Sequence, residues 1–288
     1  MKPAPFDYVR PTSVDDAVRL LHGSGGDGKV LAGGQSLVPL MNFRLAAPSL
    51  LVDLNGVSNL AYIRPDGDRL SIGPLTRMRH VERDATVRST LPLLSEAASW
   101  VGHVQIRNRG TFGGSLAHAD PAAEMPAVAL LLDASLTVAG PTGVRTIAAA
   151  DFFLGFLTTA LADDEILTDI TLRIPSSGSG WGFQEFAQRH GDFALAGAAV
   201  VVSPGEMGRV ERASIVVFGG PDAPLRAAAA EAALIGESLT VAVIEHAAAL
   251  ATQVLDEDPR ADTAYRRRLT ETMVSRALAD AGQRRDDA

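Results

Sequence analysis

The sequence predicts an α+β fold with more than one domain. A chain of 288 residues is long enough for two or three domains, each with its own core. Its N-terminal half alternates short apolar strand segments with helical segments. A Ser/Gly-rich stretch at residues 176–180 then precedes three further strand segments and three alanine-rich helices.

A small α/β unit is expected over residues 1–56. A capped helix spans about residues 14–23, a strand begins at Lys29, and a buried strand over residues 50–54 completes the expected β-α-β-β unit. The glycines of residues 23–28 match the pattern GxGxxG literally. They follow a helix and lead into a strand, the reverse of a Rossmann loop, so we interpret them as a connector.

A second, larger α+β unit is expected over residues 57–175. Two hairpin patterns with Pro/Gly turns and one alternating segment indicate its strands, and apolar residues at helical spacing indicate its helices. The predicted hairpins cover residues 60–75 and 136–147, the single strand 166–174, the helices 76–82, 91–101 and 122–132, and a loop 105–121.

The stretch Ser176-Ser177-Gly178-Ser179-Gly180 has the composition of a flexible linker and marks the clearest boundary in the chain. A C-terminal domain is expected over residues 181–288. Its predicted strands cover residues 182–188, 194–202 and 213–218, and its predicted helices cover 224–235, 240–255 and 263–281.

The composition excludes several classes of protein. A net charge of −8 argues against a nucleic-acid partner, which would require a basic face. The absence of cysteine excludes disulfides, thiolate zinc sites and cysteine-ligated iron–sulfur clusters within this chain. No apolar run is long enough for a membrane span, and residues 1–10 lack the apolar core of a signal peptide. A cytoplasmic location is therefore expected.

Two diglycine stretches are the strongest candidates for a binding site. Residues 29–37 run from an apolar strand into a diglycine and then a serine, and residues 105–121 hold a second diglycine between a threonine and a serine. Glycine permits positive φ and close approach of the backbone to a ligand, so each stretch could turn several N–H groups toward an anion. Either stretch alone is equally consistent with a tight turn. Together they suggest the two phosphates of a dinucleotide.

Other polar and aromatic residues carry weaker signals. His118 and Asp120 follow the second diglycine, and Glu124 lies one helical turn further, but no second histidine is placed to complete a metal site. We therefore predict no metal site. An aromatic residue directly after a Gly-Asp turn, as in Gly191-Asp192-Phe193, could cover one face of a flat ring. The alternative is a core phenylalanine.

Read together, these segments resemble the FAD-binding medium subunit of molybdenum hydroxylases, the family of carbon monoxide dehydrogenase and xanthine dehydrogenase. The resemblance extends over essentially the whole chain and implies a fold of the vanillyl-alcohol-oxidase (PCMH) type. Two subdomains would clamp an extended FAD, and a C-terminal domain would pack beside them. The segments that carry it are AGGQSL at 32–37, IRNRGTFGGSLAHADPAAEMP at 106–126, GDFA at 191–194 and YRR at 265–267.

The resemblance also implies which residues bind FAD. The two glycine stretches would bind the pyrophosphate, Glu124 would lie near the ribityl or ribose oxygens, and Leu167, Ile170 and Phe193 would contact the isoalloxazine. No catalytic residue beyond the bound flavin is expected in this chain. The full expected set is Leu31, Ala32, Gly33, Gly34, Gln35, Ser36, Leu37, Gly102, Thr111, Gly113, Gly114, Ser115, His118, Glu124, Leu167, Ile170 and Phe193.

The sequence departs from the family pattern in three places. Ser115 stands where an asparagine is common, which replaces an amide with a hydroxyl. Phe193 stands where tyrosine is frequent, so no phenol hydroxyl is available at that position. Glu185 and Gln188 occupy a region in which some relatives carry a lysine that can meet the flavin, which leaves Arg189 as the nearby cation.

The function that the resemblance implies is electron relay through a non-covalently bound FAD. A large partner subunit would hold a molybdenum cofactor, and a small partner subunit would hold two [2Fe–2S] clusters. The three chains would assemble as a dimer of heterotrimers. The organic substrate and the final acceptor, whether quinone, oxygen or a nicotinamide, are not specified by this chain.

Two other functions are consistent with parts of the sequence. A stand-alone flavin oxidoreductase of the same FAD fold would need an acid, a base or a covalent anchor that faces the ring. A flavin-free scaffold module would use the glycine stretches for structure alone. Bleaching of the flavin by substrate in the isolated chain would indicate the first, and a folded chain that rejects FAD would indicate the second.

Overall fold

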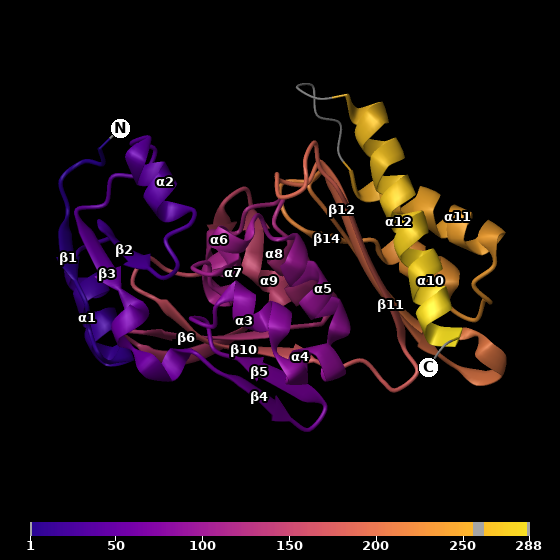
Figure 1. Cartoon of the computed structure of the whole chain (residues 1–288), viewed down its shortest axis with the longest axis horizontal. Coiled ribbons are helices and arrows are strands. Elements are labelled where there is room, and N and C mark those ends of the chain that lie inside the picture. Colours follow the sequence, from indigo (N-terminus) through magenta and orange to yellow (C-terminus); the bar gives the residue numbers. More distant parts are fainter. Residues whose placement is uncertain (1, 256–261, 287–288) are drawn as a thin grey trace.

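The computed structural model describes residues 2–255 and 262–286. Three modules lie next to one another in the order in which the chain builds them (Figure 1). The N-terminal module contains β1 to β3, the central module β4 to β10, and the C-terminal module β11 to α12. The central module therefore contacts both of the others.

The N-terminal module is a three-stranded parallel sheet in the order β1-β3-β2. Helix α1 is capped by the Ser13 side chain and packs its buried face against this sheet. Helix α2, which the sequence analysis did not predict, follows β2 directly. Its Pro39 lies in the first turn, where a missing N–H breaks no helical hydrogen bond. The elements are β1 (Asp7–Val9), α1 (Val14–Gly23), β2 (Gly28–Leu31), α2 (Leu37–Asn42) and β3 (Leu50–Asp53).

The central module is a five-stranded antiparallel sheet in the order β4-β5-β10-β6-β7, covered by short helices. Both predicted hairpins and the strand before Pro175 are present. The strands of this sheet are β4 (Ile63–Asp66), β5 (Arg69–Ile72), β6 (Ser135–Gly140), β7 (Gly143–Ala148) and β10 (Ile166–Arg173). A separate two-stranded sheet consists of β8 (Phe153–Gly155) and β9 (Thr158–Thr159). The helices are α3 (Met78–Arg83), α4 (Ala85–Thr90), α5 (Pro92–Trp100), α6 (Val104–Arg107), α7 (Phe112–His118), α8 (Glu124–Leu131) and α9 (Ala149–Phe152).

The prediction of a loop over residues 105–121 was wrong. The segment contains most of α6 and all of α7, and the second diglycine lies in the first turn of α7. Glycine costs about 1 kcal/mol per residue in a helix interior, so local propensity argued against a helix here. Thr111 overrides that preference by capping α7 and accepting a hydrogen bond from the N–H of Gly114 at 3.1 Å.

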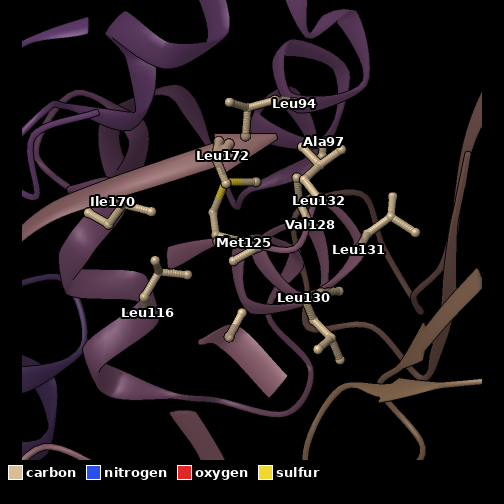
Figure 2. Packing of buried hydrophobic residues seen from close by; sticks show 14 of the residues in the cluster. Leu94, Ala97, Leu116, Met125, Val128, Leu130, Leu131, Leu132, Ile170 and Leu172 are labelled. Atoms are coloured by element: carbon tan, nitrogen blue, oxygen red, sulfur yellow. The ribbon is translucent and has the colours of Figure 1, made fainter. Parts of the chain in front are cut away.

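Helix α8 occupies the centre of the largest core, and all of its residues are buried. Figure 2 shows Met125 and Val128 of α8 among Leu116 of α7 and Ile170 and Leu172 of β10. The same cluster includes residues of β11, β12 and β13, so the central and C-terminal modules share one core. This shared core fixes the position of the C-terminal sheet relative to the site described below.

The C-terminal module is a four-stranded antiparallel sheet in the order β11-β12-β13-β14, with α10, α11 and α12 on the face away from the central module (Figure 1). The expected helix over residues 224–235 was wrong at its start, because Leu225 and Arg226 pair with β13 as a strand. The elements are β11 (Gly180–Phe186), β12 (Ala196–Pro204), β13 (Val210–Phe218), β14 (Leu225–Arg226), α10 (Ala228–Leu234), α11 (Val241–Ala251) and α12 (Thr263–Asp286).

Strand β11 begins at Gly180, inside the stretch that we expected to be a flexible linker. Gly180 is buried, and a Cβ atom there would overlap the carbonyl oxygen of Ala281 in α12. This glycine therefore permits close contact between a strand and a helix. Among the described residues, no helix is both long and apolar enough to cross a membrane.

Candidate functional site

The first diglycine forms a turn between β2 and α2. The backbone N–H groups of residues 33–37 donate to no acceptor within the described parts of the chain. Buried or half-buried N–H groups are almost always paired in proteins, so five consecutive free donors are unusual. Such a row of N–H groups is the usual backbone site for an anion.

The conformation of this turn depends on glycine at Gly34, where φ is +72°. This left-handed conformation is costly for any residue with a Cβ. Ser36 occupies the N-cap position of α2 and makes no side-chain hydrogen bond to the helix. Its hydroxyl is therefore also available to a ligand.

The second diglycine stretch packs directly against the first turn. Gly33 is buried, and a Cβ there would overlap the carbonyl oxygen of Arg109. A Cβ added to Gly114 would lie 3.7 Å from the Cβ of Ala32. The structure therefore brings together the two glycine stretches that the sequence singles out, although more than 60 residues separate them along the chain.

In the second stretch, the N–H groups of residues 112–115 already have acceptors. Phe112 donates to Thr76 and Gly113 to Pro74, each to the backbone carbonyl oxygen at 2.9 Å. The N–H of Gly114 donates to the Thr111 hydroxyl, and that of Ser115 donates to the Thr111 carbonyl oxygen. The expectation of a second row of free donors is therefore not met. Direct contacts of Thr111, Gly113, Gly114 and Ser115 with FAD stay predictions.

A hydrogen-bonded network that the sequence analysis missed supports the first turn. Asn55, which follows β3, donates to the Ala32 carbonyl oxygen at 2.9 Å. Arg77 donates to Asn55 Oδ1 at 2.5 Å and to the Arg109 carbonyl oxygen at 2.5 Å. Burial of the guanidinium, followed by the charge of Arg109, lowers the pKa of Arg77. The network thus joins the backbones of both glycine stretches through two side chains.

A second part of the site forms where the turn at Gly102 meets the turn at Gly191. Arg107 donates to the Gly102 carbonyl oxygen at 3.0 Å and forms an ion pair with Glu82 at 2.9 Å. A Cβ at Gly191 would overlap the ring of His103, so these turns are in close contact. Residues 102–110 therefore connect the Gly191 turn with the turn at Gly33.

Phe193 lies just after the Gly191 turn, and 68% of its surface is exposed. The alternative of a core phenylalanine is therefore wrong. An aromatic ring so exposed beside two glycine turns can stack on a flat ligand. Its contact with isoalloxazine stays a prediction.

The remaining predicted residues occupy different environments. His118 lies in the last turn of α7, and burial lowers its pKa. Leu167 is 5% exposed, and Ile170 is fully buried in the core (Figure 2), so its side chain is not accessible to a ligand in this structure. Their contacts with a ring stay predictions.

Within the described residues, no group of three or more acidic or histidine side chains could hold a metal ion.

Glu124 stands at the start of α8 and is 8% exposed. Burial raises its pKa to about 7. A carboxyl group with this pKa exchanges a proton near neutral pH, unlike an ordinary glutamate. Its predicted place beside the ribityl or ribose oxygens is not tested by the structure.

Comparison with known proteins identifies the class of this fold and site. The family described as the FAD binding domain in molybdopterin dehydrogenase matches residues 4–177. The family described as the CO dehydrogenase flavoprotein C-terminal domain matches residues 181–281. Together the two matches cover most of the chain and define a flavoprotein.

The similarity to individual proteins is equally extensive. The chain is 46% identical to subunit alpha of the 6-hydroxypseudooxynicotine dehydrogenase complex of Paenarthrobacter nicotinovorans, over 98% of this chain and 96% of that protein. Its structure superposes on carbon monoxide dehydrogenase from Hydrogenophaga pseudoflava with a TM-score of 0.95, 39% identity and 99% coverage of both chains. Quinoline 2-oxidoreductase from Pseudomonas putida 86 gives a TM-score of 0.93 at 36% identity, over 98% of this chain and 99% of that one.

The chain therefore belongs to the family of FAD-binding medium subunits of molybdenum hydroxylases. It is a flavoprotein subunit of a molybdenum-containing oxidoreductase, and FAD is its cofactor. Its fold is the PCMH-type FAD-binding fold followed by a C-terminal domain, as the resemblance implied.

Proposed function

We propose that this chain is the electron-transfer subunit of a molybdenum and iron–sulfur hydroxylase. It receives electrons from [2Fe–2S] clusters on a partner chain and passes them to an external acceptor. We base this on the turn at residues 33–37, whose free N–H groups suit a pyrophosphate, combined with the exposed ring of Phe193. When bound, FAD supplies the one- and two-electron chemistry of the relay.

The chain's own residues bind and orient the cofactor. The N–H groups of residues 33–37 and the Ser36 hydroxyl hold the pyrophosphate, and Asn55 and Arg77 keep that backbone in place. Phe193 covers one face of the ring and excludes water from it. The other proposed FAD contacts are Leu31, Ala32, Gly102, Thr111, Gly113, Gly114, Ser115, His118, Glu124, Leu167 and Ile170.

The partners follow from what the chain lacks and from its relatives. The sequence contains no cysteine, so the clusters must be bound by another chain. Two relatives are described as medium chains of carbon monoxide dehydrogenase, and another as a subunit of a dehydrogenase complex. We therefore propose a large molybdenum subunit and a small iron–sulfur subunit, assembled with this chain as a dimer of heterotrimers in the cytoplasm.

Rapid-mixing absorbance of the flavin band tests the relay. The FAD-loaded chain would be mixed anaerobically with nicotine, caffeine, quinoline or carbon monoxide, compounds that appear in the names of relatives. We expect no bleaching by any of them in the isolated chain. In the complex with the molybdenum and iron–sulfur chains, we expect the substrate of that complex to bleach the flavin.

The controls separate the alternatives. A complex reconstituted with the FAD-free chain should show reduction of the clusters by substrate and no flavin band. Bleaching by substrate in the isolated chain would overturn the relay and favour a stand-alone flavin oxidoreductase. A folded chain that rejects added FAD would favour a scaffold module.

A further inference from the structure

Two buried glutamates, one in the central module and one in the C-terminal module, interact electrostatically. Glu124 is the first residue of α8, and Glu185 lies in β11. Each is 8% exposed. Carboxyl groups are rarely buried to this extent unless they are paired or neutral.

Glu185 lacks the partner that a buried carboxylate needs. Its Oε2 atom is fully buried and has no hydrogen-bond partner within the described residues. Side chains alternate along β11, so Glu185 points to the same side as Phe183, which belongs to the core that contains α8. Its side chain therefore points to the side of the sheet that packs on the core containing α8.

The charges around the pair do not neutralise it. Arg107 stabilises the charged form of Glu124, and Asp120 opposes it. His118, on α7, interacts electrostatically with Asp120. Charged groups on the neighbouring elements have partners of their own. Glu96 on α5 forms an ion pair with Arg284 of α12, and Asp280 of α12 accepts a hydrogen bond from Gln184. Arg226 of β14 forms ion pairs with Asp133 and Glu231.

Two such carboxylates cannot both stay ionised at neutral pH. Burial, followed by the charge of Glu124, raises the pKa of Glu185 to about 8. Burial raises the pKa of Glu124 to about 7. Neighbouring carboxyl groups of this kind titrate as a unit, so the protons belong to the pair.

The chain and the side chain of Arg107 connect the pair with the proposed ring site. Strand β11 continues past Glu185 into the loop that carries Gly191 and the exposed Phe193. Arg107, which acts on Glu124, also holds the Gly102 turn against Gly191. A negative charge on a ring at this place would act on the same pair through a low-dielectric interior.

We propose that Glu124 and Glu185 share one proton while the flavin is oxidised and bind a second proton from water when the ring is reduced. Each electron adds a negative charge to the site, and the proton bound by the pair offsets one such charge. This proposal rests on the proposed function, because it requires the ring to lie beside Phe193. In this role Glu124 and Glu185 bind and release protons, and they form no covalent bond with the flavin.

Infrared spectroscopy of the FAD-loaded chain tests the resting state. We expect the carbonyl band of a protonated buried carboxyl at pH 7, shifted by ¹³C-glutamate and absent from the double variant E124Q/E185Q. Glu96→Gln is the matched control, because Glu96 is also partly buried with a raised pKa but lies on α5 beside Arg284. A wild-type chain without the band overturns the shared proton.

Proton uptake during reduction tests the coupling. The FAD-loaded chain would be reduced with dithionite in weak buffer that contains a pH indicator. We expect the double variant to take up about one proton fewer per flavin than the wild type at pH 7.5. The control variant should match the wild type. Equal uptake in the double variant and the wild type overturns the coupling.

The stability of the chain gives a readout that does not depend on electron transfer. Folding raises the pKa of the Glu124 and Glu185 carboxyl groups from about 4.5 to about 7 and about 8. Their contribution to the stability of the folded chain is therefore complete below the unfolded pKa near 4.5 and is lost as pH rises through about 7 to 8. We expect the wild-type thermal midpoint to fall between pH 5.5 and 8.5 more steeply than that of E124Q/E185Q. Parallel curves of thermal midpoint against pH in the two proteins would contradict the proposed proton binding by the pair. Failure of substrate to reduce the flavin in the complex would instead contradict the proposed electron relay.

Discussion

The two diglycine stretches look alike in sequence but differ in how their backbones are used. At Gly33-Gly34 the glycines open a turn whose N–H groups have no acceptor in the described chain. At Gly113-Gly114 the glycines lie inside a helical turn whose N–H groups are all bonded to protein oxygens. The first stretch can bind an anion through its backbone, and the second holds the first in place.

This difference shows that a glycine pair has two separate physical uses. Gly34 is needed for its positive φ, which exposes donors to a ligand. Gly113 is needed for the space in front of Pro74, which a Cβ would overlap. The residue type alone does not distinguish a conformational requirement from a packing requirement.

The largest effects are expected from a pair of matched substitutions. Gly34→Val places a branched side chain on a left-handed residue and blocks the N–H row. We expect FAD affinity to fall about 100-fold or more while the C-terminal module stays folded. Gly113→Val overpacks the contact with Pro74, and we expect a loss of about 1–3 kcal/mol in the free energy of unfolding.

Flavin absorbance and denaturant unfolding of the purified variants measure the two effects separately. If Gly34→Val mainly loses flavin and Gly113→Val mainly loses stability, the first stretch binds FAD and the second serves packing. If both variants lose flavin equally at unchanged stability, the second stretch also binds FAD through its backbone. Full flavin occupancy in Gly34→Val would show that the turn at residues 33–37 is not the phosphate site.

Much of the fold was predictable because it depends on local patterns. Strand β3 begins with the apolar residues Leu50, Leu51 and Val52, and the hairpin turns at 65–68 and 141–143 carry strong turn residues. Helix α7 was not predictable, because its glycines disfavour a helix and its stability comes from the carbonyl oxygens of Pro74 and Thr76. Those oxygens lie more than 30 residues away in the sequence.

The site was predictable to a similar degree. The first turn was found because a strand, two glycines and a hydroxyl form a short continuous pattern. Asn55 and Arg77 were missed because each is an ordinary polar residue in its own segment, and only the fold brings them to Ala32 and Arg109. Glu185 was noted only as a departure from a lysine, since its burial depends on packing against the core around α8.

An intermediate effect is expected from the side chains that join the two stretches. Arg77→Gln removes the hydrogen bond to the Arg109 carbonyl oxygen and weakens the contact with Asn55. Hydrogen bonds to a charged group contribute about 1.5–3 kcal/mol, so we expect FAD to dissociate roughly ten times faster. Arg64→Gln is the control, because Arg64 is exposed and lies over the Tyr62 ring. Equal dissociation rates in the two variants would show that the first turn is rigid without the network.

The smallest effects should come from two hydroxyl groups at equivalent positions, the N-caps of α2 and α7. Ser36 makes no capping hydrogen bond, whereas Thr111 accepts one from Gly114. Ser36→Ala should therefore weaken FAD binding by about one hydrogen bond, a factor of roughly two to ten, with unchanged stability. Thr111→Val should lower the free energy of unfolding by about 1 kcal/mol, because α7 loses its cap. Titration calorimetry with FAD and urea unfolding would measure the two quantities. If Ser36→Ala changed stability instead of affinity, its hydroxyl would serve α2, and the N–H groups of the first turn would have to bind the pyrophosphate without it.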